Sequence, residues 1–482
     1  MTGLLQHATS WLSAHEGWLA VLGFAWLLYL VLLGGWIVLQ KREPVATLSW
    51  LLGLALLPFV GFLVYHVFGP QKIRRHRLKR ALARADLLPE EQVEADDEAL
   101  EIARMARKAT QLPISRADDV RLLVDGAAKF EALLADIRAA TTHVHLEYYI
   151  WHPDHSGGAL RDALAERARA GVRVRLLLDA VGAAKARKFF APLLEAGGEL
   201  AWFHPPRFGR IWQRPWTNLR THRKIVVIDG RIAYTGGMNV TDDQNEAVRA
   251  DAYRDLHLRI EGPVVRMLQR VFVEDWAYAT RSHDFVDEVL RQTPPTRGVG
   301  RGIPAQVLVS GPDSQWEAIH RAHVSAIHAA RRRVWMATPY FVPGEAAMMA
   351  LTSAALAGLD VRLLVPHETD SKLVTLAARS YFGPLLVAGV RIYEYGPRML
   401  HTKALLVDDR LSIIGSANFD HRSFRLNFEV SVMFDDAGIA AQLERLMQAD
   451  MAQAREVVRG RHRPLLTARL PEALARLLSP LL

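Results

Sequence analysis

Two copies of one histidine- and lysine-containing pattern could carry out chemistry in this chain. Each copy reads H-x-K-x4-D-x6-G-[GS]-x-N, and every matched position recurs after 179 residues, as from His222 to His401. The matched residues are His222, Lys224, Asp229 and Asn239 in the first copy and His401, Lys403, Asp408 and Asn418 in the second. A single H-x-K would be uninformative, but two full copies at a constant offset indicate a duplicated functional cassette.

The residue types of the pattern suit a phosphate ester. Lysine ammonium groups offset negative charge, and the asparagine amides can orient phosphate oxygens. One neutral imidazole can attack phosphorus, while a second, protonated imidazole donates a proton to the leaving alkoxide. Imidazole suits both tasks because its ordinary pKa lies near 6.5. The pattern therefore predicts chemistry on a phosphodiester with one histidine from each copy.

An apolar, β-branched run follows each lysine, at 225–228 and 404–407, and it predicts a buried strand. Side chains alternate between the two faces of a strand, so His222 and Lys224 should point the same way. Asp229 should face the opposite side of the strand, and the same spacing in the second copy predicts the same arrangement there. We therefore expect the histidines and lysines to act on substrate and Asp229 and Asp408 to brace the framework.

Two further carboxylates stand downstream of the copies, Asp255 and Glu429, both in apolar, strand-like surroundings. An unpartnered carboxylate would be unfavourable in such surroundings. We expect each to orient one catalytic histidine by binding its second ring nitrogen, as carboxylates do in hydrolytic triads. The alternative is that both are ordinary ions at strand edges.

The paired pattern resembles the phospholipase D superfamily, whose signature is this doubled motif, and nearly the whole chain is similar to its bacterial cardiolipin synthases. The resemblance implies two halves that meet at one site, a covalent phosphohistidine, and neither metal nor cofactor. It implies His222 as nucleophile and His401 as acid and then base, although the near-symmetry leaves the reverse assignment open. One departure is visible: Gly237 stands where the second copy has Ser416.

The rest of the chain repeats as well, and strand and helix patterns alternate from about residue 118, as in an α/β fold. Residues 120–124, 144–151 and 172–178 are expected strands, and residues 129–140 and 158–170 are expected helices. The residue pattern of segment 357–364 corresponds to that of 170–177, and the pattern of 385–389 corresponds to that of 193–197. We predict duplicated phospholipase D-like α/β sandwich domains at 118–295 and 296–482, joined near 292–304 and related by a pseudo-twofold axis.

Two uncharged apolar runs at 18–39 and 45–64 precede this duplication, and each reaches the roughly 20 residues that span a bilayer. They predict a transmembrane hairpin within residues 1–70, followed by a basic and then charged, solvated helical connector at 71–117. Six basic residues between 72 and 80, without an acidic one, favour a catalytic domain on the cytoplasmic side of the bacterial inner membrane. The same run would contact anionic headgroups.

Charge and composition limit the classes of partner that the chain is expected to bind. The net charge is +9 and cysteine is absent, which favours anionic partners and excludes disulfides and thiolate metal sites. An insertion before the first copy mixes tryptophan and arginine, suiting lipid headgroups or a nucleic-acid strand; it carries Arg207, Arg210, Trp212, Arg214, Trp216 and Arg220. Because of the apolar hairpin, we expect phospholipid and no nucleic acid as the partner.

Leucines at helical spacing from Leu466 to Leu481 predict an amphipathic helix that lies on the membrane or packs on the domain.

The resemblance implies a phosphatidyltransferase that joins two phosphatidylglycerol molecules into cardiolipin and releases glycerol. A membrane-bound phospholipase D that hydrolyses phospholipid to phosphatidic acid is the second hypothesis. A catalytically silent membrane scaffold is the third, and the intact histidines, lysines and asparagines of both copies argue against it.

Overall fold

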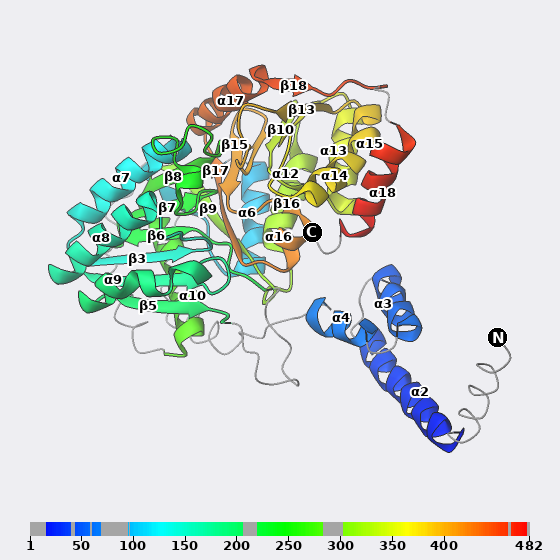
Figure 1. Cartoon of the computed structure of the whole chain (residues 1–482). Coiled ribbons are helices and arrows are strands. Elements are labelled where there is room, and N and C mark those ends of the chain that lie inside the picture. Colours follow the sequence, from blue (N-terminus) through cyan, green and yellow to red (C-terminus); the bar gives the residue numbers. More distant parts are fainter. Residues whose placement is uncertain are drawn as a thin grey trace. The chain divides into compact units, whose positions relative to one another are not determined.

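The computed structural model describes residues 16–39, 44–57, 60–68, 95, 97–205, 219–282, 302–460 and 464–479. The chain divides into a small N-terminal unit that ends at Pro70 and a large unit that contains both copies of the motif (Figure 1). The basic run at 72–80 and insertion residues 207–216 lie outside the described residues, as does most of the expected join between the halves.

The N-terminal unit is helical. Its helices are α2 (Glu16–Leu39), α3 (Pro44–Leu56) and α4 (Val60–Phe68). The sequence places Pro58 between α3 and α4, and proline lacks the amide hydrogen that a continuous helix needs. In the helices that the structure describes, no segment combines the length and apolarity required to cross a membrane. The two predicted spans are therefore not confirmed.

The first half of the large unit is built on a seven-stranded mixed sheet with the order β2-β8-β7-β6-β3-β4-β5. Strands β3, β4 and β5 run parallel, whereas β6 pairs antiparallel with β3. The bounds are β2 (Asp119–Val124), β3 (His143–Tyr148), β4 (Arg173–Asp179), β5 (Glu199–Phe203), β6 (Ile225–Ile228), β7 (Ile232–Gly236) and β8 (Leu256–Glu261).

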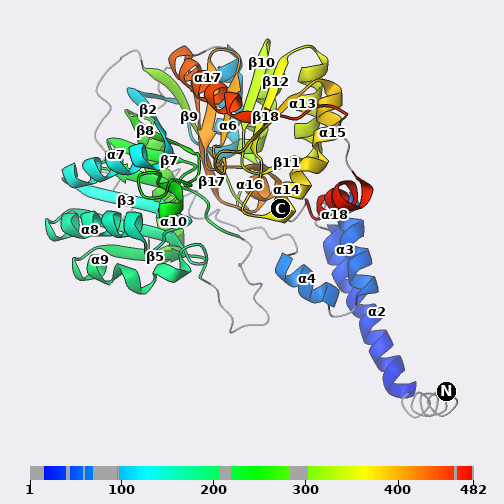
Figure 2. The same ribbon diagram turned by 45° about the horizontal axis from the view of Figure 1, so that its top comes forward.

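The second half repeats this order in a nine-stranded sheet, β1-β9-β17-β15-β14-β10-β12-β13-β18, with β1 and β18 added at the edges. Figure 2 labels β9, β17, β10, β12 and β18 of this sheet. The register repeats as well, because Glu147 pairs with Ile225 and Ala337 pairs with Ala404 at equivalent positions. The bounds are β1 (Ser115–Ala117), β9 (Ile303–Ser310), β10 (Arg333–Ala337), β12 (Asp360–Pro366), β13 (Arg391–Tyr395), β14 (Ala404–Val407), β15 (Leu411–Gly415), β17 (Glu429–Asp435) and β18 (Ala454–Glu456). The duplicated α/β fold predicted from the sequence is thus present.

Helices cover the sheets and complete three apolar cores. The helices of the first half are α7 (Asp125–Ala139), α8 (His155–Arg169), α9 (Ala191–Glu195) and α10 (Val265–Thr280). Those of the second half are α12 (Ala318–Ala329), α13 (Glu345–Leu356), α14 (Lys372–Ser380), α15 (Phe382–Ala388), α16 (His421–Arg425), α17 (Ala437–Ala452) and α18 (Leu470–Leu477). One core joins α10 and α17 to side chains from both sheets, so the two halves are fused by apolar packing.

The connector before the first sheet differs from the prediction. Helix α6 (Asp97–Thr110) buries Ala99, Ile102, Ala103 and Ala106 against the core of the second half, and β1 pairs with β9. The small alanines at spacings of three and four form a narrow apolar stripe. Residues 97–117 are therefore part of the second half and not a solvated link.

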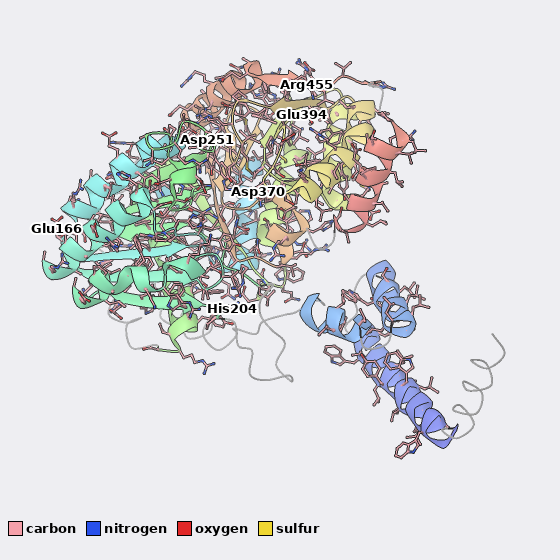
Figure 3. The ribbon with its side chains drawn as sticks, in the orientation of Figure 1. Glu166, His204, Asp251, Asp370, Glu394 and Arg455 are labelled. Atoms are coloured by element: carbon pink, nitrogen blue, oxygen red, sulfur yellow. The ribbon has the colours of Figure 1, made fainter. Side chains whose placement is uncertain are left out.

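A buried carboxylate with two partly exposed arginine partners lies near the far edge of the second sheet. The Glu394 carboxylate on β13 accepts a hydrogen bond at 2.6 Å from Arg455 on β18 and another at 2.9 Å from Arg379 on α14 (Figure 3). A buried carboxylate requires such partners. This cluster explains why the short strand β18 stays on the sheet.

Candidate active site

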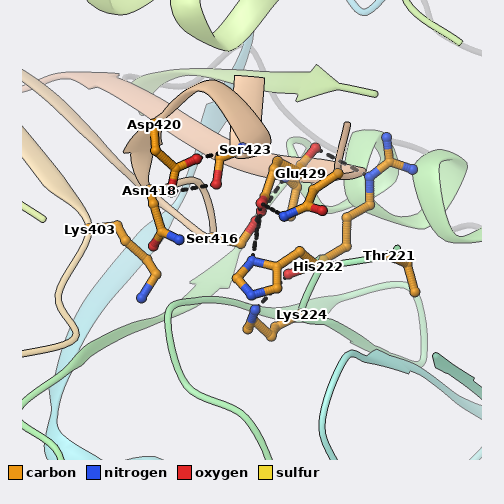
Figure 4. Close-up of polar contacts among 12 residues, drawn as sticks. Thr221, His222, Lys224, Lys403, Ser416, Asn418, Asp420, Ser423 and Glu429 are labelled. Atoms are coloured by element: carbon orange, nitrogen blue, oxygen red, sulfur yellow. Dashed lines mark hydrogen bonds and ion pairs between the residues drawn. The ribbon is translucent and has the colours of Figure 1, made fainter. Parts of the chain in front are cut away.

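The first copy of the motif lies just before β6. Lys224 is fully buried, and its Nζ donates a hydrogen bond to the carbonyl oxygen of His222 at 2.6 Å. The strand begins at Ile225, so His222 and Lys224 occupy the extended segment that leads into it. Figure 4 shows both side chains beside Lys403 and Asn418 of the second half.

The second copy has the same local structure before β14. Lys403 is buried, and its Nζ donates to the carbonyl oxygen of His401 at 2.5 Å. In both copies the lysine bonds the peptide of its own histidine, which fixes the ammonium group next to the ring. The shared backbone arrangement is consistent with the single residue that separates histidine from lysine in both copies.

Main-chain hydrogen bonds cross between the halves at both histidines. The His222 amide donates to the Phe428 carbonyl at 2.9 Å, and the Phe428 amide donates to Arg220 at 2.9 Å. The His401 amide likewise donates to the Arg254 carbonyl at 2.7 Å. Each histidine segment is therefore tied to the segment of the other half that carries the downstream carboxylate.

His222 is held by a carboxylate from the second half. Its Nδ1 lies 3.1 Å from Glu429 Oε1, and the Glu429 side chain is completely buried. Ser416 Oγ donates to Glu429 Oε2 at 2.5 Å and Asn427 Nδ2 donates to Oε1 at 3.3 Å. An ionised carboxylate can only accept, so Nδ1 carries the proton and Nε2 keeps its lone pair.

His401 is held in the same way by a carboxylate from the first half. Its Nδ1 lies 2.6 Å from Asp255 Oδ2, and both side chains are buried. Gln244 Nε2 is 3.2 Å from the same ring nitrogen. The expected histidine–carboxylate pairs both form, and both connect opposite halves of the chain.

The difference between Gly237 and Ser416 has a steric cause. A Cβ placed on Gly237 would lie 2.2 Å from Asp255 Oδ1. Aspartate is one methylene shorter than glutamate, so its carboxylate lies nearer the backbone and fills the space that Ser416 occupies in the other half. Position 237 therefore lacks a side chain in the half where the orienting acid, Asp255, is an aspartate and not a glutamate.

The two asparagines have different partners. Asn239 Oδ1 accepts a hydrogen bond from the Ile150 backbone amide at 3.2 Å, and the Asn239 backbone amide donates to Gln244 Oε1. The Asn418 backbone amide donates to Ser423 Oγ at 3.2 Å. Asn418 Oδ1 is buried and has no hydrogen-bond partner among the described residues. An unpaired carbonyl oxygen of this kind can accept a hydrogen bond from a donor such as a hydroxyl group.

The motif aspartates lie away from the histidines and brace the chain. The Asp229 carboxylate accepts hydrogen bonds from the backbone amides of Thr141, Thr142 and His143 at 2.8–3.0 Å. Asp408 accepts from three consecutive amides in the same manner, those of residues 331–333, at 2.8–3.0 Å. These bonds outweigh desolvation and lower the pKa of Asp229 to about 2.

Burial dominates the electrostatics of the histidines and lysines. It lowers the pKa of His401 to about 4 and also lowers that of His222, where the nearby Glu429 carboxylate opposes the change. Burial lowers the pKa of Lys224 to about 7 and that of Lys403 to about 8. The positive charge of Lys403 contributes to the lowered pKa of His222, and the charge of Lys224 contributes to the lowered pKa of His401. The cations of both halves therefore lie near both rings. An anion in this site would raise all of these pKa values.

The structure adds polar residues that the sequence reasoning did not select. Gln244 accepts a hydrogen bond from the Asn239 backbone amide and has its Nε2 beside His401 Nδ1, and its counterpart Ser423 lies at the motif's own offset of 179 residues. That offset was the available signal. Lys129 is fully buried and its Nζ donates to the Asn239 carbonyl at 3.0 Å; no motif pointed to it. Arg220 of the insertion is also buried, in an ion pair with Asp179, so it does not face a headgroup.

Comparison of the sequence with known protein families gives two matches. Residues 133–276 and 324–451 match the family described as "Cardiolipin synthase, PLD-like domain". The chain belongs to this family. Residues 24–70 match the family described as "Phospholipase_D-nuclease N-terminal", in the part of the chain that forms the N-terminal unit.

Named relatives span nearly the whole chain. A cardiolipin synthase of Geobacillus sp. (strain WCH70) is 38% identical, covering 92% of this chain and 91% of its own length. Cardiolipin synthase 2 of Bacillus anthracis is 39% identical, with 94% and 90% covered. The cardiolipin synthase of Alkalihalophilus pseudofirmus is 37% identical, with 97% and 95% covered.

A solved structure shares the fold. Phosphatidylserine synthase of Haemophilus influenzae aligns with a TM-score of 0.60 and 14% sequence identity, covering 79% of this chain and 100% of that chain. At this identity the likeness concerns the arrangement of the two halves alone.

Proposed function

We propose that this chain synthesises cardiolipin by transferring a phosphatidyl group from one phosphatidylglycerol to another. The observation that carries the proposal is the pair of motif histidines, each with Nδ1 bound to a buried carboxylate of the opposite half. Relatives named cardiolipin synthase at 38–39% identity over more than 90% of the chain support the choice of reaction.

In the first step, Nε2 of one histidine attacks phosphorus and the bond to the glycerol headgroup breaks. We assign this role to His222, following the family, and give His401 the role of donating a proton to the departing glycerol oxygen. Burial lowers the pKa of both rings and so favours their uncharged forms. The phosphodiester anion supplies the charge that favours protonation of the second ring.

In the second step, the terminal hydroxyl of another phosphatidylglycerol loses its proton to His401 and attacks phosphorus. The phosphorus–nitrogen bond breaks, cardiolipin forms and His222 is regenerated. Lys224 and Lys403 offset the phosphoryl charge, and the amides of Asn239 and Asn418 orient its oxygens. The two lysines are buried and come from opposite halves of the chain.

The deciding experiment is product analysis. Purified protein is incubated with phosphatidylglycerol vesicles, and lipids are measured by mass spectrometry together with released glycerol. Cardiolipin and glycerol in equal amounts support the transferase. Phosphatidic acid as the main product would instead assign the chain to the hydrolases, and no product at all would favour the scaffold hypothesis.

We also propose that the N-terminal unit attaches the enzyme to the bacterial inner membrane, with the catalytic unit on the cytoplasmic side. Apolar side chains of α2 are exposed in the structure, among them Trp18 at 71%, Phe24 at 69% and Leu39 at 78%. Exposed apolar surface of this kind marks a membrane or protein contact. Protease digestion of the catalytic unit in inside-out but not right-side-out vesicles would agree with this sidedness, and the opposite result would reverse it.

A further inference from the structure

The C-terminal helix α18 (Leu470–Leu477) packs with its polar side inward. Its buried residues are Glu472 and Ala475, followed by Ser479 just beyond the helix, at 2–6% exposure. Tyr381 at the end of α14 donates a hydrogen bond to Ser479 Oγ at 2.9 Å, and the Arg476 guanidinium lies 4.5 Å from the Tyr381 ring centroid. Polar and small groups therefore attach this helix to the protein.

The leucines of the same segment point outward. The turn that precedes α18, Leu465–Arg469, continues this apolar surface. Exposed fractions range from 42% to 75%, and the residues are Leu465, Leu466, Leu470, Leu474, Leu477 and Leu478. A surface helix of a soluble domain normally buries its apolar side. The orientation of α18 is the reverse, which leaves a continuous apolar surface without a partner among the residues of the large unit that the structure describes.

The exposed charges on this surface are all positive. Arg469 and Arg476 are exposed beside the leucines, whereas the acidic residue of the segment, Glu472, is buried. Apolar side chains flanked by arginine and free of exposed carboxylates match an anionic lipid surface, into which such a helix inserts its leucines. A second protein surface would need complementary acidic groups at its edge.

The position of α18 relative to the catalytic residues suits a lipid contact. Helix α18 packs on α14, as both views show, and α14 contacts β11 (Phe341–Val342). Strand β11 pairs with β16 (Phe419–Asp420), which directly follows Asn418. Helices α18 and α14 therefore connect the leucine surface to the strand that follows Asn418.

We propose that residues 465–478 form a second membrane contact, in which the exposed leucines enter the outer part of an anionic bilayer and hold the catalytic unit against its lipid substrate. This contact deepens the proposed function, on which its purpose rests. It differs from the N-terminal attachment because it belongs to the large unit. It gives the active site a fixed orientation toward the membrane surface.

The test uses the absence of cysteine in the chain. Leu474→Cys in the full-length protein is labelled with an environment-sensitive fluorophore and reconstituted into phosphatidylglycerol vesicles. The matched control is Leu194→Cys on α9, another half-exposed helical leucine, at 47% exposure against 55% for Leu474. Quenching is measured with spin-labelled lipid and with aqueous iodide.

We expect lipid quenching at position 474 and iodide quenching at position 194. Free access of iodide to position 474 in vesicles would overturn the proposal. So would shielding of position 474 from both quenchers, because the leucines would then be covered by protein, either the N-terminal unit or a second copy. These readouts do not depend on catalysis, so they separate failure of this contact from failure of the proposed function.

A second variant tests the purpose of the contact. Leu474→Asn combined with Leu477→Asn should lower cardiolipin synthesis on vesicles by about tenfold or more, because withdrawing each leucine from lipid weakens partitioning by about that factor. Activity on a short-chain, monomeric phosphatidylglycerol should stay within about twofold. Unchanged synthesis on vesicles would contradict the role of the leucines, whereas equal losses on both substrates would show a folding defect and also count against it.

Discussion

Nδ1 of His222 lies 3.1 Å from the Glu429 carboxylate, although 207 residues separate the two in the chain. The reciprocal pair, His401 and Asp255, is separated by 146 residues and lies at 2.6 Å. Neither half can therefore orient its own histidine. The site exists only when the two halves are packed together, which explains why they share one apolar core.

Replacing Glu429 should abolish most of the activity with little change in shape. Glu429→Gln keeps the size of the side chain but cannot hold the Nδ1 proton as an anion, so we expect kcat to fall by about 10²–10⁴-fold. The measurement is steady-state cardiolipin synthesis alongside thermal unfolding. The matched control is Glu394→Gln, a buried carboxylate of the same half that pairs with Arg379 and Arg455. It should lower stability and leave kcat within about threefold; equal kcat losses in the two variants would contradict the assignment.

A methyl group at position 237 should disturb the other pair. In Gly237→Ala the new Cβ would meet Asp255 Oδ1 at 2.2 Å, so the carboxylate must leave His401, and we expect kcat to fall by about tenfold or more. Gly158→Ala is the control because a Cβ there has no atom within 4 Å; in helix α8 it should be stabilising by about 1 kcal/mol. Normal turnover of the Gly237 variant would show that Asp255 is not needed beside His401.

The motif aspartates should matter for stability more than for turnover. Asp229→Asn removes a carboxylate that accepts hydrogen bonds from three consecutive backbone amides. We expect a loss of about 1–2 kcal/mol in the free energy of unfolding, with kcat of the folded protein within about threefold at a temperature well below the transition. Asp251→Asn, at an exposed ion pair with Arg249, should change neither quantity. A loss of kcat without a loss of stability would assign Asp229 to the chemistry.

Substrate affinity should weaken as the pH rises. In the free site the pKa of Lys224 is about 7 and that of Lys403 about 8, and the bound phosphate anion favours their charged forms. Binding therefore takes up protons above these values, and KM for phosphatidylglycerol should rise from about pH 7 to about pH 9. Lys224→Met should show a shallower rise because one titrating group is gone. A KM that stays constant across this range would exclude the lysines as the phosphate-binding cations.

Much of this arrangement follows from the sequence because the fold is duplicated. The constant offset identified the histidines, lysines and asparagines, and the repeated strand patterns predicted the two sheets. The crossing of Asp255 and Glu429 between halves did not follow, because spacing along one chain does not say which half supplies a partner in space. The sequence predicts a solvated helix where α6 is partly buried, because the buried face of α6 consists mainly of alanines, which give a weak hydrophobic pattern among many charges.

The central claim is that His222 and His401 act on one phosphorus atom with different roles. The direct test is rapid quenching of Wild-type, His222→Ala and His401→Ala proteins with headgroup- and phosphate-labelled phosphatidylglycerol, followed by mass spectrometry of the intact protein. We predict that neither variant makes cardiolipin and that only His401→Ala carries a covalent phosphatidyl group, on His222. Full cardiolipin synthesis by either variant, or adducts on both histidines, would contradict the account.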